Sequence, residues 1–214
     1  MIHLLLPLVM ILMVQELLSR EFDRRYFLST LTYPHPRRSL LLGRFISVAM
    51  LSLGLLLVLA GALALLVRLI GQGYPQNTPV ALGLPYLATI AFLALDLLLL
   101  TGVAVLLAIV ASTPSFVLIG TLGFMLIARS FGAIIELLTR NAAVVTDAET
   151  YRSSIGLLRY LFPDLGALDI RMVALYGRME LLPADWPWLA LSSLSYTAAV
   201  LAIAVWVLQR KRFA

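Results

Sequence analysis

The chain has 214 residues, of which 62% are hydrophobic and 13% are charged, and its mean hydropathy is +1.00. Soluble domains average about 45–50% apolar and about 25% charged residues, so this composition indicates an integral membrane protein. Without cysteine the chain has no disulfide framework, thiol catalysis or cysteine-ligated metal, and His3 and His35 offer little material for a metal site. The net charge is +5, but the basic residues lie beside apolar segments, where they orient a membrane protein. We therefore expect no nucleic-acid binding.

Apolar runs long enough to cross a bilayer occur five times along the chain. A helix needs about 20 apolar residues to cross a hydrocarbon core of about 30 Å. The five runs are residues 2–18, 45–67, 85–111, 115–138 and 186–208. The first run lacks the basic start and the cleavage site of a secretory signal. The predicted fold class is therefore all-α, a polytopic helical membrane protein in which residues 1–214 form a single transmembrane domain.

Arginines give the expected orientation of the runs, because short cytoplasmic segments retain positive charge. They cluster between the first two runs, and basic residues follow the last run at 210–212. Four runs separate the two clusters, so both fit a cytoplasmic location, and residues 71–84 and 139–185 are then extracytoplasmic. Met1 is placed outside, so either the first run inserts as a reversed anchor or a span that normally precedes it is absent.

The cytoplasmic segment 16–44 is the most informative part of the sequence. Its first half has apolar residues near helical spacing, with arginines on the other side, which predicts a helix that continues out of the membrane. Pro34-His35-Pro36 then ends that helix, because proline lacks the donor that a helix interior needs. One interpretation is an amphipathic elbow that lies on lipid headgroups.

A second interpretation comes from a resemblance. The order Ser19-Arg20-Glu21, then Arg25, an apolar stretch, Pro34, Arg37 and Leu41-Leu42-Gly43-Arg44-Phe45 resembles the segment between the second and third helices of ABC-2 type transporter permeases. In that family the segment carries the coupling helix that docks into the cognate ATPase. Two differences are Tyr26, where threonine is common, and the added Pro36. The resemblance implies an ATPase-coupling role for Arg20, Glu21, Arg24, Arg25, Pro34, Arg37, Arg38 and Arg44.

The same resemblance implies a function. The chain would be the permease subunit of an ABC exporter of the inner membrane, working as a dimer with a second copy or a homologous permease, although the family normally has six spans. It would use a separate P-loop ATPase that carries ATP and Mg, since this sequence has no phosphate-binding loop before Lys211, its only lysine. We expect no cofactor and no catalytic site in this chain. The alternative is a scaffold or assembly protein whose basic elbow binds lipid. A membrane-embedded enzyme is disfavoured, with Asp96 as its only candidate acid.

Asp96 and Arg129 lie within the third and fourth apolar runs, where buried charges are costly. At about 1.5 Å rise per residue, Asp96 lies about 16 Å below the outer face and Arg129 about 21 Å above the inner face. In a core of about 30 Å their depths differ by about 7 Å, which helix tilt and the arginine stem can close. They either form a structural ion pair or place Arg129 on a translocation path. Glu136 is another possible partner of Arg129.

The outer loop 139–185 contains two segments with helical spacing. The first covers residues 151–162, a break follows at Pro163-Asp164-Leu165-Gly166, and the second covers residues 168–175 and ends at Gly177. Two short helices before the last span resemble the outer gate helices of ABC-2 permeases. A loop that lies on the outer leaflet is the alternative.

Overall fold

The computed structural model describes residues 2–16, 37–73, 81–111, 113–140 and 163–210. Across these residues the chain is helical and contains no β-strand, which confirms the predicted all-α class. The elements are α1 (Ile2–Val14), α4 (Arg37–Gly73), α5 (Leu84–Val110), α6 (Pro114–Arg140), α8 (Arg171–Tyr176), the short 3₁₀ helix η2 (Met179–Leu181) and α9 (Trp186–Arg210).

Three of these helices, α4, α5 and α9, are long and apolar enough to cross a membrane. The described apolar parts of the other two predicted spans are shorter, at Leu5–Val14 in α1 and Pro114–Ser130 in α6. Each predicted span therefore falls on a helix, but among the described residues three of these helices are both long enough and apolar enough for a crossing.

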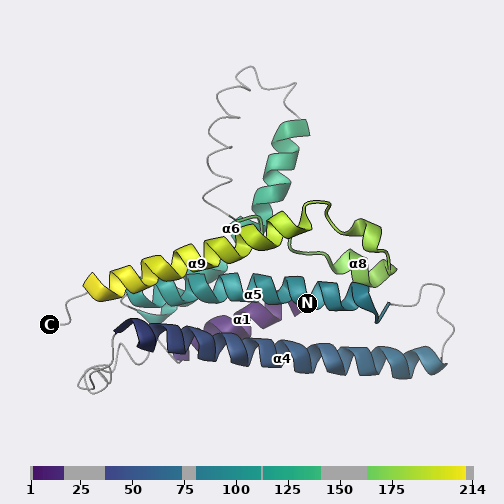
Figure 1. Ribbon diagram of the computed structural model, residues 1–214, viewed down its shortest axis with the longest axis horizontal. Helices are drawn as coiled ribbons and strands as arrows, with labels where there is room; N and C mark the ends of the chain where they lie inside the picture. Colours follow the sequence, from purple (N-terminus) through teal and green to yellow (C-terminus); the bar gives the residue numbers. More distant parts are fainter. Residues whose placement is uncertain (1, 17–36, 74–80, 112, 141–162, 211–214) are drawn as a thin grey trace.

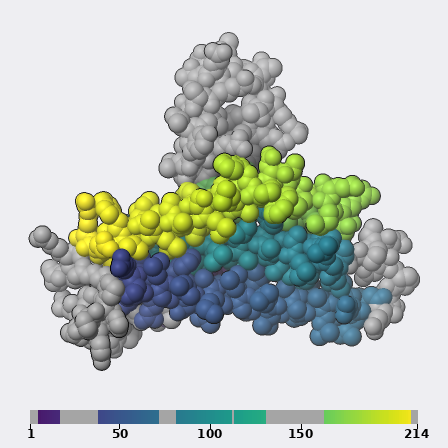
Figure 2. Space-filling view, in the orientation of Figure 1, coloured from purple at the N-terminus to yellow at the C-terminus, as the bar shows by residue number. Residues whose placement is uncertain are grey.

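Helix α5 is at the centre of the arrangement and packs against α1, α4, α6, α8 and α9 (Figure 1). Helices α5 and α9 run in the same direction, and α4 runs opposite to both. Figure 2 shows α4 and α9 on the two sides of α5. The N-terminal end of α4 and the C-terminal ends of α5 and α9 consequently lie together, with α8 at the other end.

The core is built around the C-terminal half of α5. Leu99, Leu100 and Ala104 are fully buried there, and they share one cluster with Met125 of α6 and Ala204 of α9. Three buried threonine hydroxyls do not interrupt this packing, since each of them donates a hydrogen bond to a carbonyl one turn earlier in its own helix. The threonine donors are Thr101, Thr121 and Thr197, with donor–acceptor distances of 2.7, 2.7 and 2.9 Å.

Helix α4 contacts the rest of the chain along one narrow stripe. Its buried residues recur at helical spacing and are Leu41, Val48, Ala49, Ser52, Leu56 and Ala60. The hydroxyl of Tyr86 in α5 also donates a hydrogen bond of 2.6 Å to the carbonyl of Ala60. Most of the remaining surface of α4 is apolar and exposed, as expected for a helix that faces lipid or another chain.

The helix boundaries differ most from the prediction in α4. The predicted span covers residues 45–67, whereas the helix begins at Arg37 and ends at Gly73. No proline lies between Pro36 and Pro75, so nothing in the sequence stops the helix at the edges of its apolar run. The end of the predicted elbow, residues 37–44, is therefore part of α4, while residues 17–36 lie outside the described residues.

A short helix, α8, is present in the second predicted segment of the outer loop, but it begins at Arg171 rather than at residue 168. It ends where the sequence predicts, at Gly177, which adopts the left-handed conformation with φ of 65°. A side chain at Gly177 would also approach the Cβ of Ala81 to 3.0 Å. The first predicted helix, at residues 151–162, lies outside the described residues.

Candidate functional site

The candidate site is an ion pair between the middle of α5 and α6. Nη2 of Arg129 lies 2.6 Å from Oδ2 of Asp96, and it donates a hydrogen bond to that oxygen. The Asp96 side chain is 5% exposed and that of Arg129 is 23% exposed. The structure thus brings together the two charges that the sequence places at similar depths in neighbouring spans.

Burial determines how much this ion pair contributes to the free energy of folding. Asp96 lies between the fully buried Leu97 and the half-buried Leu95, and at about 1.5 Å per residue it is about 18 Å from the start of α5. In a bilayer that α5 crosses, water and headgroups would be distant at that depth, so each charge would depend on protein partners. An ion pair in such surroundings costs free energy to desolvate, and removal of either partner is more costly still.

A loop that precedes α8 packs against α6 at Arg129, and the sequence analysis did not predict this. The backbone of Gly166 approaches α6 so closely that a Cβ there would lie 2.9 Å from the carbonyl oxygen of Arg129. The turn is held by Oδ1 of Asp164, which accepts a hydrogen bond of 3.1 Å from the amide of Ala167. Leu165 and Leu168 of the same turn are buried in the main core.

A second carboxylate acts on the site from this loop. Asp169 lies near enough for its charge to act on the carboxylate of Asp96, and it also forms an ion pair of 3.4 Å with Arg171. No local pattern in the sequence distinguishes Gly166 or Asp169 from ordinary loop residues. Their role follows only from the fold, which places residues 164–169 against a helix that ends more than 20 residues earlier.

The arrangement has two chemical capacities. It joins α5 to α6 through charge, and it presents an acceptor, because Oδ1 of Asp96 has no hydrogen-bond partner among the described residues. A polar donor group or a water molecule can occupy that position. Within the same part of the chain, no group of three His, Cys, Asp or Glu side chains is arranged to hold a metal.

The other predicted site residues are placed as follows. The side chain of Glu136 lies outside the described residues, as do Arg20, Glu21, Arg24, Arg25 and Pro34. Arg37 is the first residue of α4, Arg38 is exposed and Arg44 is half-buried. Arg38 and Arg210 lie near the same end of the helices, because α4 begins where α9 ends (Figure 1).

Comparison with known proteins adds no assignment. No protein-family model matches this chain, and no curated protein matches it with significant similarity.

Proposed function

We propose that the chain is the membrane-spanning permease subunit of an ABC-2 type exporter, driven by a separate ATPase and dimeric with itself or with a related permease. Its five spans are then α1, α4, α5, α6 and α9, and α9 ends in the cytoplasm. The main support is the resemblance of residues 19–45 to the coupling segment of that family. The proposal implies an inner-membrane location.

One structural observation supports this proposal. The N-terminal end of α4, with Arg38 and Arg44, lies at the same end of the molecule as Arg210 of α9. Short cytoplasmic segments retain arginine, and an ATPase that offers carboxylates can bind such groups through charge-assisted hydrogen bonds. The coupling segment, residues 16–44, leads directly into this basic end.

Helix α4 has the form of a lever for this task. Its 37 residues form one helix from Arg37 to Gly73, about 55 Å long at about 1.5 Å per residue. It contacts the other helices along a single stripe, which includes Leu41 and Val48 in the core around α5, so a movement at Arg37 can be passed along the helix to its far end. The loop before α8 and the Asp96–Arg129 pair then keep α5 and α6 together while α4 moves.

The test is purification of the tagged protein from its native membrane in a mild detergent, with mass spectrometry of the accompanying proteins. We expect a P-loop ATPase near equal stoichiometry that is lost on charge reversal of Arg24 and Arg25. Charge reversal of Arg68, which is exposed near the other end of α4, is the matched control and should retain the ATPase. Absence of an ATPase under conditions that preserve other transporters contradicts the proposal.

The scaffold alternative makes a different prediction for the elbow. A surface that only binds lipid tolerates rearrangement of residues 20–44 at constant charge, because headgroup binding depends on charge and apolar content rather than on order. A docking helix does not tolerate it. Retained function of such a rearranged chain would favour the scaffold.

A further inference from the structure

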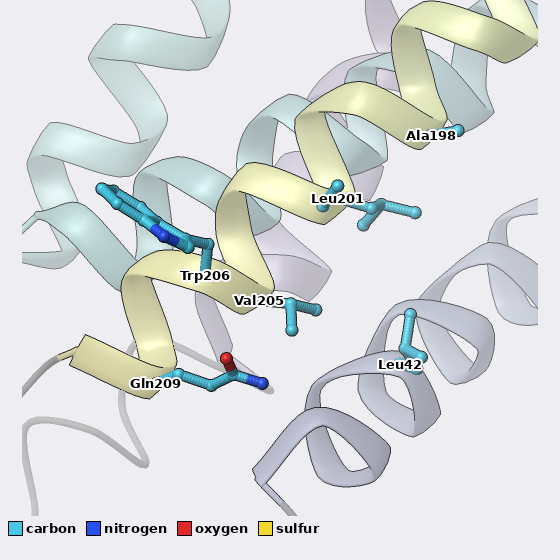
Figure 3. A pocket seen from close by; sticks show the side chains of 7 residues that line it. Leu42, Ala198, Leu201, Val205, Trp206 and Gln209 are labelled. Atoms are coloured by element: carbon cyan, nitrogen blue, oxygen red, sulfur yellow. The ribbon is translucent and has the colours of Figure 1, made fainter.

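An apolar groove lies between α9 and the N-terminal part of α4 (Figure 3). The groove is open to the surface and has a volume of about 510 Å³, within the range of about 300–1,000 Å³ that ligand sites occupy. On α9 its lining follows one helical row, formed by Ala198, Leu201, Val205 and Gln209, and Figure 3 shows Val205 and Gln209 on the side of α9 that faces Leu42 of α4. Gln209, at the end of that row, is its polar member.

The length of the groove corresponds to one leaflet. From Ala198 to Gln209 the row extends about 17 Å at about 1.5 Å per residue. Half of a hydrocarbon core of about 30 Å is about 15 Å. The row also ends at the C-terminal end of α9, where the apolar sequence gives way to Arg210. An acyl chain that enters from that end would fill the groove to the middle of the bilayer.

Positive charge lies at the same end of the groove. Arg38 is exposed and precedes Leu42 by four residues, which places it on the same face of α4 one turn nearer the helix start. Helical side chains incline toward the N-terminus, so Arg38 extends beyond the groove toward the headgroup region. Arg210 lies at the same end of α9, but its guanidinium is 4.1 Å from the centre of the Trp206 ring, which Figure 3 shows turned away from Leu42.

We propose that this groove binds an anionic glycerophospholipid, with one acyl chain between α4 and α9 and the phosphate beside Arg38 and Gln209. An apolar channel with a cation and an amide at one end complements such a lipid in both parts. This site requires a membrane around the chain but no ATPase and no transport, so it stands or falls independently of the proposed function.

The test measures lipid retained by the full chain. The protein is reconstituted in vesicles of phosphatidylglycerol and phosphatidylcholine in equal amounts, extracted in mild detergent and examined by native mass spectrometry. One variant, Ala202→Phe, fills the groove at an exposed position of its lining, and Ala62→Phe, exposed on α4 far from the groove, is its control. Arg38→Gln removes the cation, and Arg68→Gln, exposed near the opposite end of α4, is its control.

The wild-type chain should retain phosphatidylglycerol in preference to phosphatidylcholine by about fivefold, the contribution of one arginine near an anionic surface. Ala202→Phe should lose the bound lipid, and Arg38→Gln should keep a bound lipid but lose the preference. Both controls should behave as the wild type. Equal retention by Ala202→Phe and Ala62→Phe, or equal preference in both arginine variants, overturns the proposal. A change of oligomeric state in Ala202→Phe with unchanged lipid overturns it too, and assigns the groove to a second copy of the chain.

Discussion

Helices α4 and α5 are equally apolar over their best 18-residue windows, yet they are buried to opposite degrees. In those windows 67% of the α5 residues are buried inside the chain, against 11% for α4. Hydropathy alone therefore identifies helices that suit a membrane but does not tell which of them lies at the centre. Protein contacts shield α5 from water, whereas α4 would need lipid or another chain to cover its apolar surface.

The difference lies in a few small and polar residues. Helix α5 contains Asp96, Thr101 and Gly102 in its buried part, and each contacts or bonds to protein. In α4, a Cβ at Gly54 or Gly61 would meet nothing within 4 Å. A polar or small residue within an apolar run thus indicates a protein-facing helix only when residues of another helix pack against it or bond to it. This is expected for helix packing in lipid.

The largest expected effect follows from removal of the charge in α5. Asp96→Ala leaves Arg129 without the carboxylate to which it donates, and we expect stability to fall by about 3–5 kcal/mol. The double variant Asp96→Leu/Arg129→Met should regain most of this loss, because neither charge of the pair then remains without its partner. Thermal unfolding in detergent, followed by circular dichroism, measures both.

The control for this prediction is Glu180→Ala, which removes an exposed carboxylate of η2 and should leave the unfolding temperature unchanged. If Asp96→Ala unfolds at the wild-type temperature, the ion pair does not hold α5 to α6. The greater burial of α5 compared with α4 would then depend on side-chain packing and not on the ion pair.

A smaller effect is expected where α5 meets α9. A Cβ at Gly102 would lie 3.4 Å from Cγ2 of Thr197, an ordinary contact, so alanine fits, whereas leucine must push the helices apart. We expect Gly102→Leu to cost about 1–3 kcal/mol. Gly54→Leu is the matched change on α4 and should stay within about 0.5 kcal/mol of the wild type. Equal unfolding temperatures for the two variants would show that Gly102 does not set the helix spacing.

The mildest experiment leaves the sequence unchanged. A carbene precursor dissolved in the bilayer, activated by light, should label the exposed Leu57, Val58 and Leu65 of α4 several-fold more than the buried Leu99 and Leu100 of α5. Peptide mass spectrometry gives the ratio. Equal labelling would mean that another chain covers α4, and the exposed apolar face would then be an interface.

Much of the helical framework could be predicted because its signals are local. Gly83 and Pro85 mark the start of α5, and Gly177 marks the end of α8, each through its own backbone preference. The ends of α4 were missed because an apolar run tells where lipid begins, whereas a helix stops only at a residue that breaks it. The depths estimated from the helical rise per residue were sufficient to predict that Asp96 can reach Arg129, since both residues lie on regular helices.

The loop before α8 could not be predicted by the same means. A glycine is required at position 166 because the backbone there approaches the carbonyl of Arg129, 37 positions earlier in the sequence. No sequence pattern near Gly166 predicts this contact. The same holds for Asp169, whose charge matters only through its distance from Asp96. Long-range contacts of irregular segments have no periodicity to reveal them.

The unbroken length of α4 also makes the molecule responsive to bilayer thickness. Arg38 and Arg68 are 30 residues apart on this helix, or about 45 Å, which matches the distance of about 40–45 Å between the two headgroup layers. In a thinner bilayer α4 must tilt to keep both guanidinium groups at the headgroups. Since α5 is held from several sides and α4 along one stripe, α4 takes up that tilt, and the groove beside α9 changes width with it.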